Sequence, residues 1–372
     1  MQIPFLGNIN ANEFLRIYWQ KKPLLIRGAF VDFDEPFTPK QILQLAADER
    51  SECRLIQHER GKWQLEHGPL SVAQIKRLPK RNWTILVQDT QHFSRAAATL
   101  LQQFSFIPHA RVDDLMVSYA APGGGVGPHF DSYDVFLLQG SGRRRWRISA
   151  QRDLALQPDS PLKILSRFKA QQEWVLEKGD MLYLPPGYAH EGVALDECLT
   201  YSIGFRAPSN QELTTAFVDF LRDELNMPGQ YADTALRATT RPGEIPPAMR
   251  SGLKKSLRQI RWDDALMERF IGCYLSEPKA HVFFDAPHSP LTPKQFARQA
   301  RLRGLTLDLK SRMLYCGEYI FINSESFHAA GEDVVLLRAL ADQRALLPGC
   351  LTHTGSALLY DWYLQGYLHP NT

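Results

Sequence analysis

The stretch Gly127-Pro128-His129-Phe130-Asp131 decides the fold prediction for this chain. Side chains alternate between faces along a β-strand, so we expect His129 and Asp131 to point the same way, about 7 Å apart at ~3.3 Å per residue. A second histidine, His190, follows a short apolar strand and the turn Pro185-Pro186-Gly187. Two imidazoles and one carboxylate form the facial ligand set that leaves open positions on iron(II). The same ligands also suit catalytic zinc.

A buried histidine paired with a carboxylate is the simpler interpretation of His129 and Asp131. Charged residues are rarely buried without a partner, and such a pair would satisfy itself. The segment around His190 favours a metal site instead, because three polar ligands that converge inside a small β-barrel need something to bind there.

Short apolar runs separated by turn residues recur from Asp113 to about Phe205. This pattern predicts a β-sandwich or a small barrel. The expected strands are Leu115–Tyr119, His129–Leu138, Arg144–Ile148, Glu173–Leu176, Met181–Leu184 and Leu199–Phe205.

The arginine-rich run at 143–147 contains a candidate anion-binding residue. Alternation puts Arg144 on the apolar face that carries Trp146 and Ile148, so Arg144 should point into the barrel. A buried guanidinium is costly unless it meets an anion. The far carboxylate of 2-oxoglutarate would be such an anion, held by two hydrogen bonds, with Ser118 as a second donor. A carboxylate-binding cation near the metal ligands favours iron(II) over zinc. The alternative interpretation of the arginine run is a solvated basic strand that contacts an acidic neighbour or RNA.

Composition narrows the classes of function. The chain has 43 basic and 40 acidic residues, a net charge of +3 that does not predict direct nucleic-acid binding. Its five cysteines show no Cys-x-x-Cys spacing, which indicates free thiols in a reducing compartment. We find no secretory signal and no run of eighteen apolar residues, so we expect a cytoplasmic protein that does not enter a membrane.

The glycine-rich stretch at 121–127 is followed by a strand, not a helix, so it is not a phosphate loop. We expect it to let the backbone approach the metal and substrate.

Two proline-containing breaks predict three parts in an α+β chain. Boundaries at Pro208 and Pro278 separate a barrel domain at 1–208, a helical segment at 209–277 and a winged-helix-like domain at 278–372. The expected elements outside the barrel are helices at 12–19, 39–47, 93–104, 211–224, 248–275, 293–303, 334–345 and 356–368, and strands at 23–28, 305–309, 312–315 and 319–322.

Four segments of the chain resemble the JmjC-type ribosomal oxygenases. They are Tyr18–Ile26 (YWQKKPLLI), Gly123–Gln139 (GGGVGPHFDSYDVFLLQ), Gly142–Trp146 (GRRRW) and Gly179–Gly192. With Tyr201–Arg206 (YSIGFR) added, the likeness is greatest to the bacterial members that hydroxylate an arginine in a 50S ribosomal protein of the L-sixteen family.

This resemblance implies a JmjC barrel of the double-stranded β-helix (cupin-like jelly-roll) type, a helical dimerisation segment that makes a homodimer, and a C-terminal winged helix. It implies that His129, Asp131 and His190 bind iron(II) and that Arg144 binds the C5 carboxylate of 2-oxoglutarate, with O₂ as the second cosubstrate. The implied reaction is hydroxylation at the β-carbon of an arginine in a large-subunit ribosomal protein. Tyr133 and Ser202 are candidate contacts for the arginine guanidinium, and structural packing explains each equally well.

Three other functions share some of these features. A cupin-like metalloprotein, either an isomerase or a binding module, would use the same ligands but would have no use for an inward Arg144. A histone-type demethylase would need an aromatic cage for methyl-lysine, and we find no such cluster in the sequence. A winged-helix nucleic-acid binder with a vestigial barrel would have no reason to carry all three metal ligands.

Overall fold

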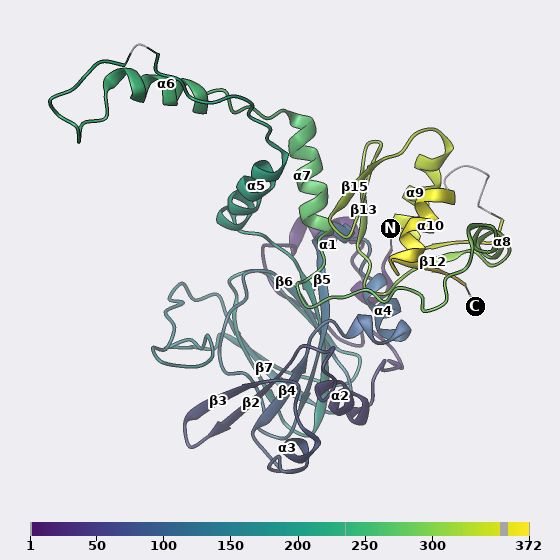
Figure 1. Ribbon diagram of the computed structural model, residues 1–372. Coiled ribbons are helices and arrows are strands. Elements are labelled where there is room, and N and C mark those ends of the chain that lie inside the picture. Colours follow the sequence, from purple (N-terminus) through teal and green to yellow (C-terminus); the bar gives the residue numbers. More distant parts are fainter. Residues whose placement is uncertain (1, 235, 350–355, 372) are drawn as a thin grey trace. The chain divides into compact units, whose positions relative to one another are not determined.

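The computed structural model describes residues 2–234, 236–349 and 356–371 (Figure 1). The chain divides into two compact units, and each is described by itself. The first comprises Met1–Ala207, Lys279–Asp285 and Asp308–Lys310; the second comprises Pro208–Pro278, Ala286–Leu307 and Ser311–Thr372. The first boundary lies close to the predicted one at 208. Two short segments of the predicted C-terminal domain, 279–285 and 308–310, belong to the first unit, because Lys279 and Lys310 form ion pairs within it.

The first unit opens with helices whose starts are capped as the sequence suggests. Asn10 accepts a hydrogen bond from the backbone N–H of Glu13 at the start of α1, and Thr38 and Gln41 form a reciprocal capping box at the start of α2. The helical elements are the short 3₁₀ turns Pro4–Leu6, Thr90–His92 and His109–Arg111, and the helices α1 (Ala11–Ile17), α2 (Pro39–Ala46), α3 (Val72–Lys76) and α4 (Arg95–Gln102).

Two β-sheets form the body of this unit (Figure 1). The larger has eight strands in the order β1-β9-β6-β11-β5-β4-β2-β3, and the smaller has three in the order β10-β7-β8. The strands are β1 (Leu24–Ile26), β2 (Cys53–Glu59), β3 (Lys62–His67), β4 (Trp83–Val87), β5 (Val112–Ala120), β6 (Asp134–Gln139), β7 (Arg144–Ser149), β8 (Gln172–Leu176), β9 (Met181–Leu184), β10 (Ala189–Ala194) and β11 (Cys198–Phe205).

The predicted strand His129–Leu138 is wrong at its start, because β6 begins only at Asp134. His129 lies in the segment before β6 and forms an isolated antiparallel bridge with His190. The backbone N–H of each histidine donates to the carbonyl of the other, at 2.9 and 2.8 Å. Gly127 takes a φ of +77° and Pro128 has no N–H, so a regular ladder cannot run through this segment.

The main hydrophobic core covers the outer face of the large sheet. Phe14 of α1 packs against Phe136 of β6 and Tyr183 of β9, with ring centroids 5.3 and 4.9 Å apart. Phe104, after α4, packs on Phe136 at 5.0 Å. The N-terminal helices therefore bury the outer apolar face and leave the inner face of the sheet to line a cavity.

The second unit begins with three helices, α5 (Asn210–Glu224), α6 (Pro247–Leu257) and α7 (Asp264–Ser276) (Figure 1). The predicted single helix at 248–275 is wrong, because the helix breaks between α6 and α7. Asp263 caps α7 by accepting a hydrogen bond from the N–H of Leu266 at 2.8 Å. Phe217 of α5 packs on Phe270 of α7, with centroids 5.0 Å apart.

The rest of the second unit mixes helices with two three-stranded sheets, ordered β16-β12-β17 and β13-β14-β15. Its elements are α8 (Pro293–Arg303), β12 (Leu305–Leu307), β13 (Met313–Cys316), β14 (Tyr319–Ile322), β15 (Glu325–His328), α9 (Glu332–Gln343), β16 (Ala345–Leu346), α10 (Ser356–Leu364) and β17 (Leu368–Pro370). The predicted helices and hairpin are present. The sequence reasoning missed β15, β16 and β17, and it extended the last helix into β17.

Two sequence predictions concern the whole chain. Within the described ranges, no helix combines the length and apolar character needed to span a bilayer. Four of the five cysteines (Cys53, Cys198, Cys273 and Cys316) carry free thiols, as predicted. Cys350 lies outside the described residues.

Candidate metal centre

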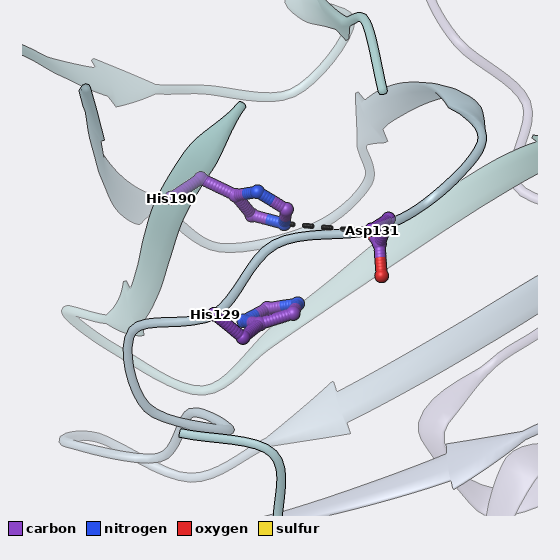
Figure 2. A group of neighbouring side chains, drawn as sticks. All are labelled: His129, Asp131 and His190. Atoms are coloured by element: carbon purple, nitrogen blue, oxygen red, sulfur yellow. Dashed lines mark ion pairs between the residues drawn. The ribbon is translucent and has the colours of Figure 1, made fainter. Parts of the chain in front are cut away.

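The structure brings His129, Asp131 and His190 together (Figure 2). One ligand atom from each residue lies within 4.8 Å of those from the other two. His190 comes from β10, and the other two come from the segment before β6. The bridge between His129 and His190 fixes one side of the group, and the N–H of Gly187 donates to the carbonyl of Asp131 at 2.7 Å on the other. The Pro-Gly turn therefore positions the carboxylate as well as His190.

The two imidazoles are oriented by hydrogen bonds to nearby backbone carbonyls. Nδ1 of His129 lies 3.0 Å from the carbonyl oxygen of Gly127, and Nδ1 of His190 lies 2.9 Å from that of Tyr188. A carbonyl oxygen only accepts, so each Nδ1 is the donor, and each Nε2 is left as the ring atom that can bind a metal. This is the arrangement that orients metal-binding histidines through their second nitrogen.

His190 is uncharged at neutral pH. Burial, together with the neighbouring His129, lowers the pKa of His190 to about 4. Its Nε2 lies 3.6 Å from Oδ2 of Asp131, the contact dashed in Figure 2. Because a neutral ring forms no ion pair, this contact is better explained as two ligand atoms that face one common point. The donor set fits a divalent metal ion with open positions.

The three residues line a cavity of about 450 Å³ between the two sheets. All seven residues singled out from the sequence line it: His129, Asp131, His190, Arg144, Ser118, Tyr133 and Ser202. Apolar side chains such as Met116, Leu137 and Trp146 contribute much of the remaining wall. A pocket with an apolar lining and a few converging polar groups is typical of a small-molecule site.

Arg144 points inward, as alternation predicts. It is only 5% exposed, and its Nε atom has no hydrogen-bond partner among the described residues. Its nearest described polar partner is the thiol sulfur of Cys198, 3.7 Å from Nη2. The hydroxyl of Ser118 is also buried without a partner in the described part of the chain. Buried polar groups without partners are costly, so an arginine Nε and a serine hydroxyl left without partners in one cavity fit an anionic ligand.

Strand register places Arg144 and Ser118 at one end of the cavity. Ser118 pairs with Thr200, and Thr200 pairs with Gln139, the last residue of β6. Arg144 begins the next strand, β7, a few residues later. Along β7, Arg144 lies four residues from Ile148, which pairs with His190. That separation is roughly 13 Å along the backbone at ~3.3 Å per residue, part of which the arginine side chain spans.

Comparisons with known proteins agree with this geometry. A family model described as the JmjC domain matches residues 99–213, and one described as a ROXA-like winged helix matches residues 259–369. The chain is 34% identical, over 91% of its own length and 90% of the relative's, to the ribosomal protein uL16 3-hydroxylase of Escherichia coli. A probable ribosomal oxygenase of Haemophilus influenzae is 40% identical over 55% of this chain and 52% of its own. The structure of the E. coli ribosomal oxygenase YcfD in complex with cobalt and 2-oxoglutarate superposes with a TM-score of 0.82 at 32% identity, covering 97% of this chain and 98% of that one.

The chain belongs to the JmjC-domain ribosomal oxygenases. The predicted fold is confirmed: a JmjC, cupin-like barrel with helical segments and a C-terminal winged helix.

The sequence reasoning missed an acidic wall in the cavity of this ribosomal oxygenase. Asp113 and Asp114 of β5 line the cavity, and Asp114 is only 7% exposed. Burial raises the pKa of Asp114 to about 7, although the nearby Lys279 opposes the shift. The available signal was alternation, since Asp114 lies on the same face of β5 as Ser118, four residues away.

Tyr133 and Ser202, the candidate contacts for the substrate, line the cavity. The phenol of Tyr133 is held in its neutral form, because burial and the carboxylates of Asp131, Asp114 and Asp113 raise its pKa. Ser202 of β11 is 7% exposed. Both residues line the cavity together with Gly204 and the acidic wall.

The glycine-rich stretch at 121–127 was predicted to let the backbone approach the metal and substrate, but its tightest contacts are with neighbouring strands. A Cβ atom on Gly124 would lie 2.1 Å from the carbonyl oxygen of Trp83, and one on Gly125 would lie 2.4 Å from that of Gly192. These glycines therefore allow close contact with the backbones of β4 and β10. Their tight neighbours are strands of the barrel rather than the metal ligands.

Proposed function

We propose that this protein is an iron(II)- and 2-oxoglutarate-dependent oxygenase that hydroxylates the β-carbon of an arginine in the large-subunit ribosomal protein uL16. The observation that carries the proposal is the buried Arg144 without a partner for its Nε, in the same cavity as the three-ligand group. A metalloprotein that did not bind an anionic cosubstrate would have no reason to bury this guanidinium.

His129, Asp131 and His190 would hold the iron through two Nε2 atoms and one carboxylate oxygen. When bound, iron(II) supplies the oxygen activation that amino-acid side chains cannot provide. The protein's contribution is to orient both imidazoles through their Nδ1 hydrogen bonds, to keep the ring of His190 neutral, and to leave part of the metal's coordination open to the cavity.

Arg144 and Ser118 would bind the C5 carboxylate of 2-oxoglutarate. A bidentate guanidinium–carboxylate contact fixes both the position and the plane of the carboxylate. The register between β7 and β10 leaves room for a five-carbon diacid between Arg144 and the triad. The apolar walls from Leu137 and Trp146 exclude water from the chain of this cosubstrate.

The acidic wall would receive the arginine of the substrate. A guanidinium next to Asp114 would form charge-assisted hydrogen bonds with a carboxylate that is largely removed from water. Tyr133, neutral and a potential donor or acceptor, and Ser202 would complete the contacts to this side chain. Holding the guanidinium at a fixed distance from the triad presents one methylene group of the arginine for reaction.

Assembly and location are part of the same proposal. Exposed apolar side chains on the helices of the second unit, among them Val218 at 59% and Leu257 at 67%, support a homodimer through this segment. A ribosomal protein as substrate supports a site of action in the cytoplasm. Light scattering that detects only monomer at micromolar concentration would remove the dimer from the proposal.

Mass spectrometry provides the decisive experiment. The protein is incubated with iron(II), 2-oxoglutarate, O₂ and uL16 or its arginine-containing peptides, in parallel with His129→Ala and Arg144→Ala. The expected result is a gain of one oxygen on one arginine, absent in both variants. Turnover of 2-oxoglutarate without oxygen on any peptide would overturn the substrate, and metal binding with no turnover at all would favour a cupin-like protein.

A further inference from the structure

A short segment far from the barrel in sequence reaches the acidic wall. Residues 279–285, here called the strap, belong to the first unit. The Nζ atom of Lys279 lies 3.2 Å from both carboxylate oxygens of Asp89, 3.3 Å from Oδ2 of Asp114 and 3.5 Å from Oδ1 of Asp113. One ammonium group therefore contacts three carboxylates, two of which line the cavity.

The contact with Lys279 leaves one oxygen of Asp114 without a described hydrogen-bond partner. Oδ2 faces Lys279 and also lies 3.4 Å from the backbone N–H of Asp89. Oδ1 accepts no hydrogen bond from any described residue, and a Cβ on the cavity-lining Gly204 would lie 3.4 Å from it. Lys279 thus contacts Oδ2, and Oδ1 lies beside the cavity-lining Gly204.

The carboxylates need this cation. Asp89 and Asp114 are only 3% and 7% exposed. Like charges in such a cluster favour uptake of a proton, and burial acts in the same direction. The pKa of Asp114 lies at about 7 with Lys279 in place, and Lys279 is the strongest of the neighbours that lower it. Without Lys279, burial and the carboxylates of Asp89 and Asp113 would shift Asp114 further toward its protonated form.

We propose that Lys279 is a positioning residue for the substrate arginine: its charge favours the carboxylate form of Asp114, and its contact with Oδ2 leaves Oδ1 to meet the substrate guanidinium. This role rests on the proposed function and deepens it. Specificity for a cationic side chain then depends on a residue that does not touch the substrate. The strap thus contributes to the substrate site through the charge of Lys279.

The other groups around Asp114 do not replace Lys279. On the strap, His281 contacts Asp89 at 3.1 Å and Glu52 at 3.3 Å, and no contact joins it to Asp114 among the described residues. His92, beside Asp89, is kept neutral because burial lowers its pKa to about 4. Other polar or charged groups that line the cavity include Asp113, the neutral phenol of Tyr133, Gln88 and Arg54, whose Nε has no described partner.

A second lysine provides a matched control. Lys310 contacts the same strap. Its Nζ atom donates to the carbonyl of Phe283 and lies 3.1 Å from Oδ2 of Asp285. It contacts none of the cavity carboxylates. Lys310→Met therefore loosens the strap and leaves the charge next to Asp114 intact, whereas Lys279→Met removes that charge.

The test measures arginine hydroxylation of a uL16 peptide by the full chain from pH 6.5 to 9. Lys279→Met should raise the peptide KM roughly 10- to 100-fold at pH 7, with recovery toward pH 9 as Asp114 ionises. The KM for 2-oxoglutarate should not change. Lys279→Arg should keep the wild-type peptide KM, and Lys310→Met should not produce the pH-dependent rise. Asp114→Asn should raise the peptide KM at every pH, without recovery.

The outcomes separate the two proposals. If the wild type adds no oxygen to arginine, the proposed function fails and this inference falls with it. If the wild type is active but Lys279→Met keeps its peptide KM at all pH values, or Lys310→Met shows the same profile as Lys279→Met, the inference alone is overturned. If Lys279→Met does not fold, Lys279→Arg and Asp114→Asn still test the inference. A normal peptide KM in Asp114→Asn would refute the proposed role.

Discussion

Replacing Arg144 by methionine should separate ligand binding from folding stability. The guanidinium is 5% exposed, and its Nε has no described partner. Methionine has a similar length and fills an apolar environment readily. Removing an unpaired buried charge in favour of an apolar side chain is often neutral or stabilising. We therefore expect the ligand-free Arg144→Met protein to melt at the same temperature as the wild type or higher.

Binding of 2-oxoglutarate should weaken strongly in the same variant. Truncating one partner of a buried, hydrogen-bonded charge pair costs about 2–5 kcal/mol. At about 1.4 kcal/mol per factor of ten, this corresponds to a 30-fold to several-thousand-fold rise in the Kd for 2-oxoglutarate. The metal ligands are untouched, so the affinity for cobalt or iron(II) should stay near that of the wild type.

Three measurements on one preparation check this reasoning: a thermal melt without ligands, a metal titration, and succinate formation as a function of 2-oxoglutarate concentration. Arg143→Met is the matched control, since Arg143 directly precedes the same strand, half-exposed and paired with Asp196 at 2.8 Å. It should leave all three measurements unchanged. A normal 2-oxoglutarate affinity in Arg144→Met would refute the proposal that Arg144 binds the C5 carboxylate. A large loss of stability would show that the arginine stabilises the fold.

Three further predictions concern stability. Tyr183→Phe removes the donor 2.6 Å from the fully buried carboxylate of Asp134 and should destabilise the first unit by about 1–3 kcal/mol, seen as a lower Tm. Burial holds the pKa of His92 at about 4 against 6.5 for a free histidine, so the folded state should lose up to about 3 kcal/mol as the pH falls from 6.5 to 4; His92→Gln should remove this part of the acid destabilisation in melts across that range. Gly125→Ala would push a Cβ to within 2.4 Å of a carbonyl of β10 and should cost about 1–3 kcal/mol in denaturant unfolding, whereas Gly243→Ala, with nothing within 4 Å, should cost little.

Local periodicity was sufficient for the parts of the site that lie on regular strands. The inward direction of Arg144 follows from alternation with Trp146 and Ile148, and the burial of all three residues confirms it. The segment at His129 could not be predicted in the same way, because an extended loop held by one bridge has the same sequence pattern as a strand start. The break before α7 was missed because apolar residues continue at helical spacing on both sides of Asp263.

The contact between Lys279 and Asp89 joins residues 190 positions apart, and it lies beyond any pattern within a segment. Such contacts depend on how the whole chain folds back on itself, and a single sequence carries no record of which distant charges meet. Sequence reasoning therefore found the cavity residues that local geometry reveals, such as the His129, Asp131 and His190 group and Arg144. It missed Asp114 and the lysine that contacts it from elsewhere in the chain.

Under the proposed function, one strand determines which end of the cavity receives each of the two organic ligands. Asp114 and Ser118 share the inward face of β5, roughly 13 Å apart at ~3.3 Å per residue, with Met116 between them. Ser118 lies at the same end as the cation Arg144, and Asp114 lies at the end where β6 begins, near Tyr133. A diacid is attracted to the first end and repelled from the second, and a guanidinium behaves in the opposite way. Because both groups stand on one rigid strand, the distance between the two binding ends is set by strand geometry, and neither ligand can take the place of the other without burying like charges together.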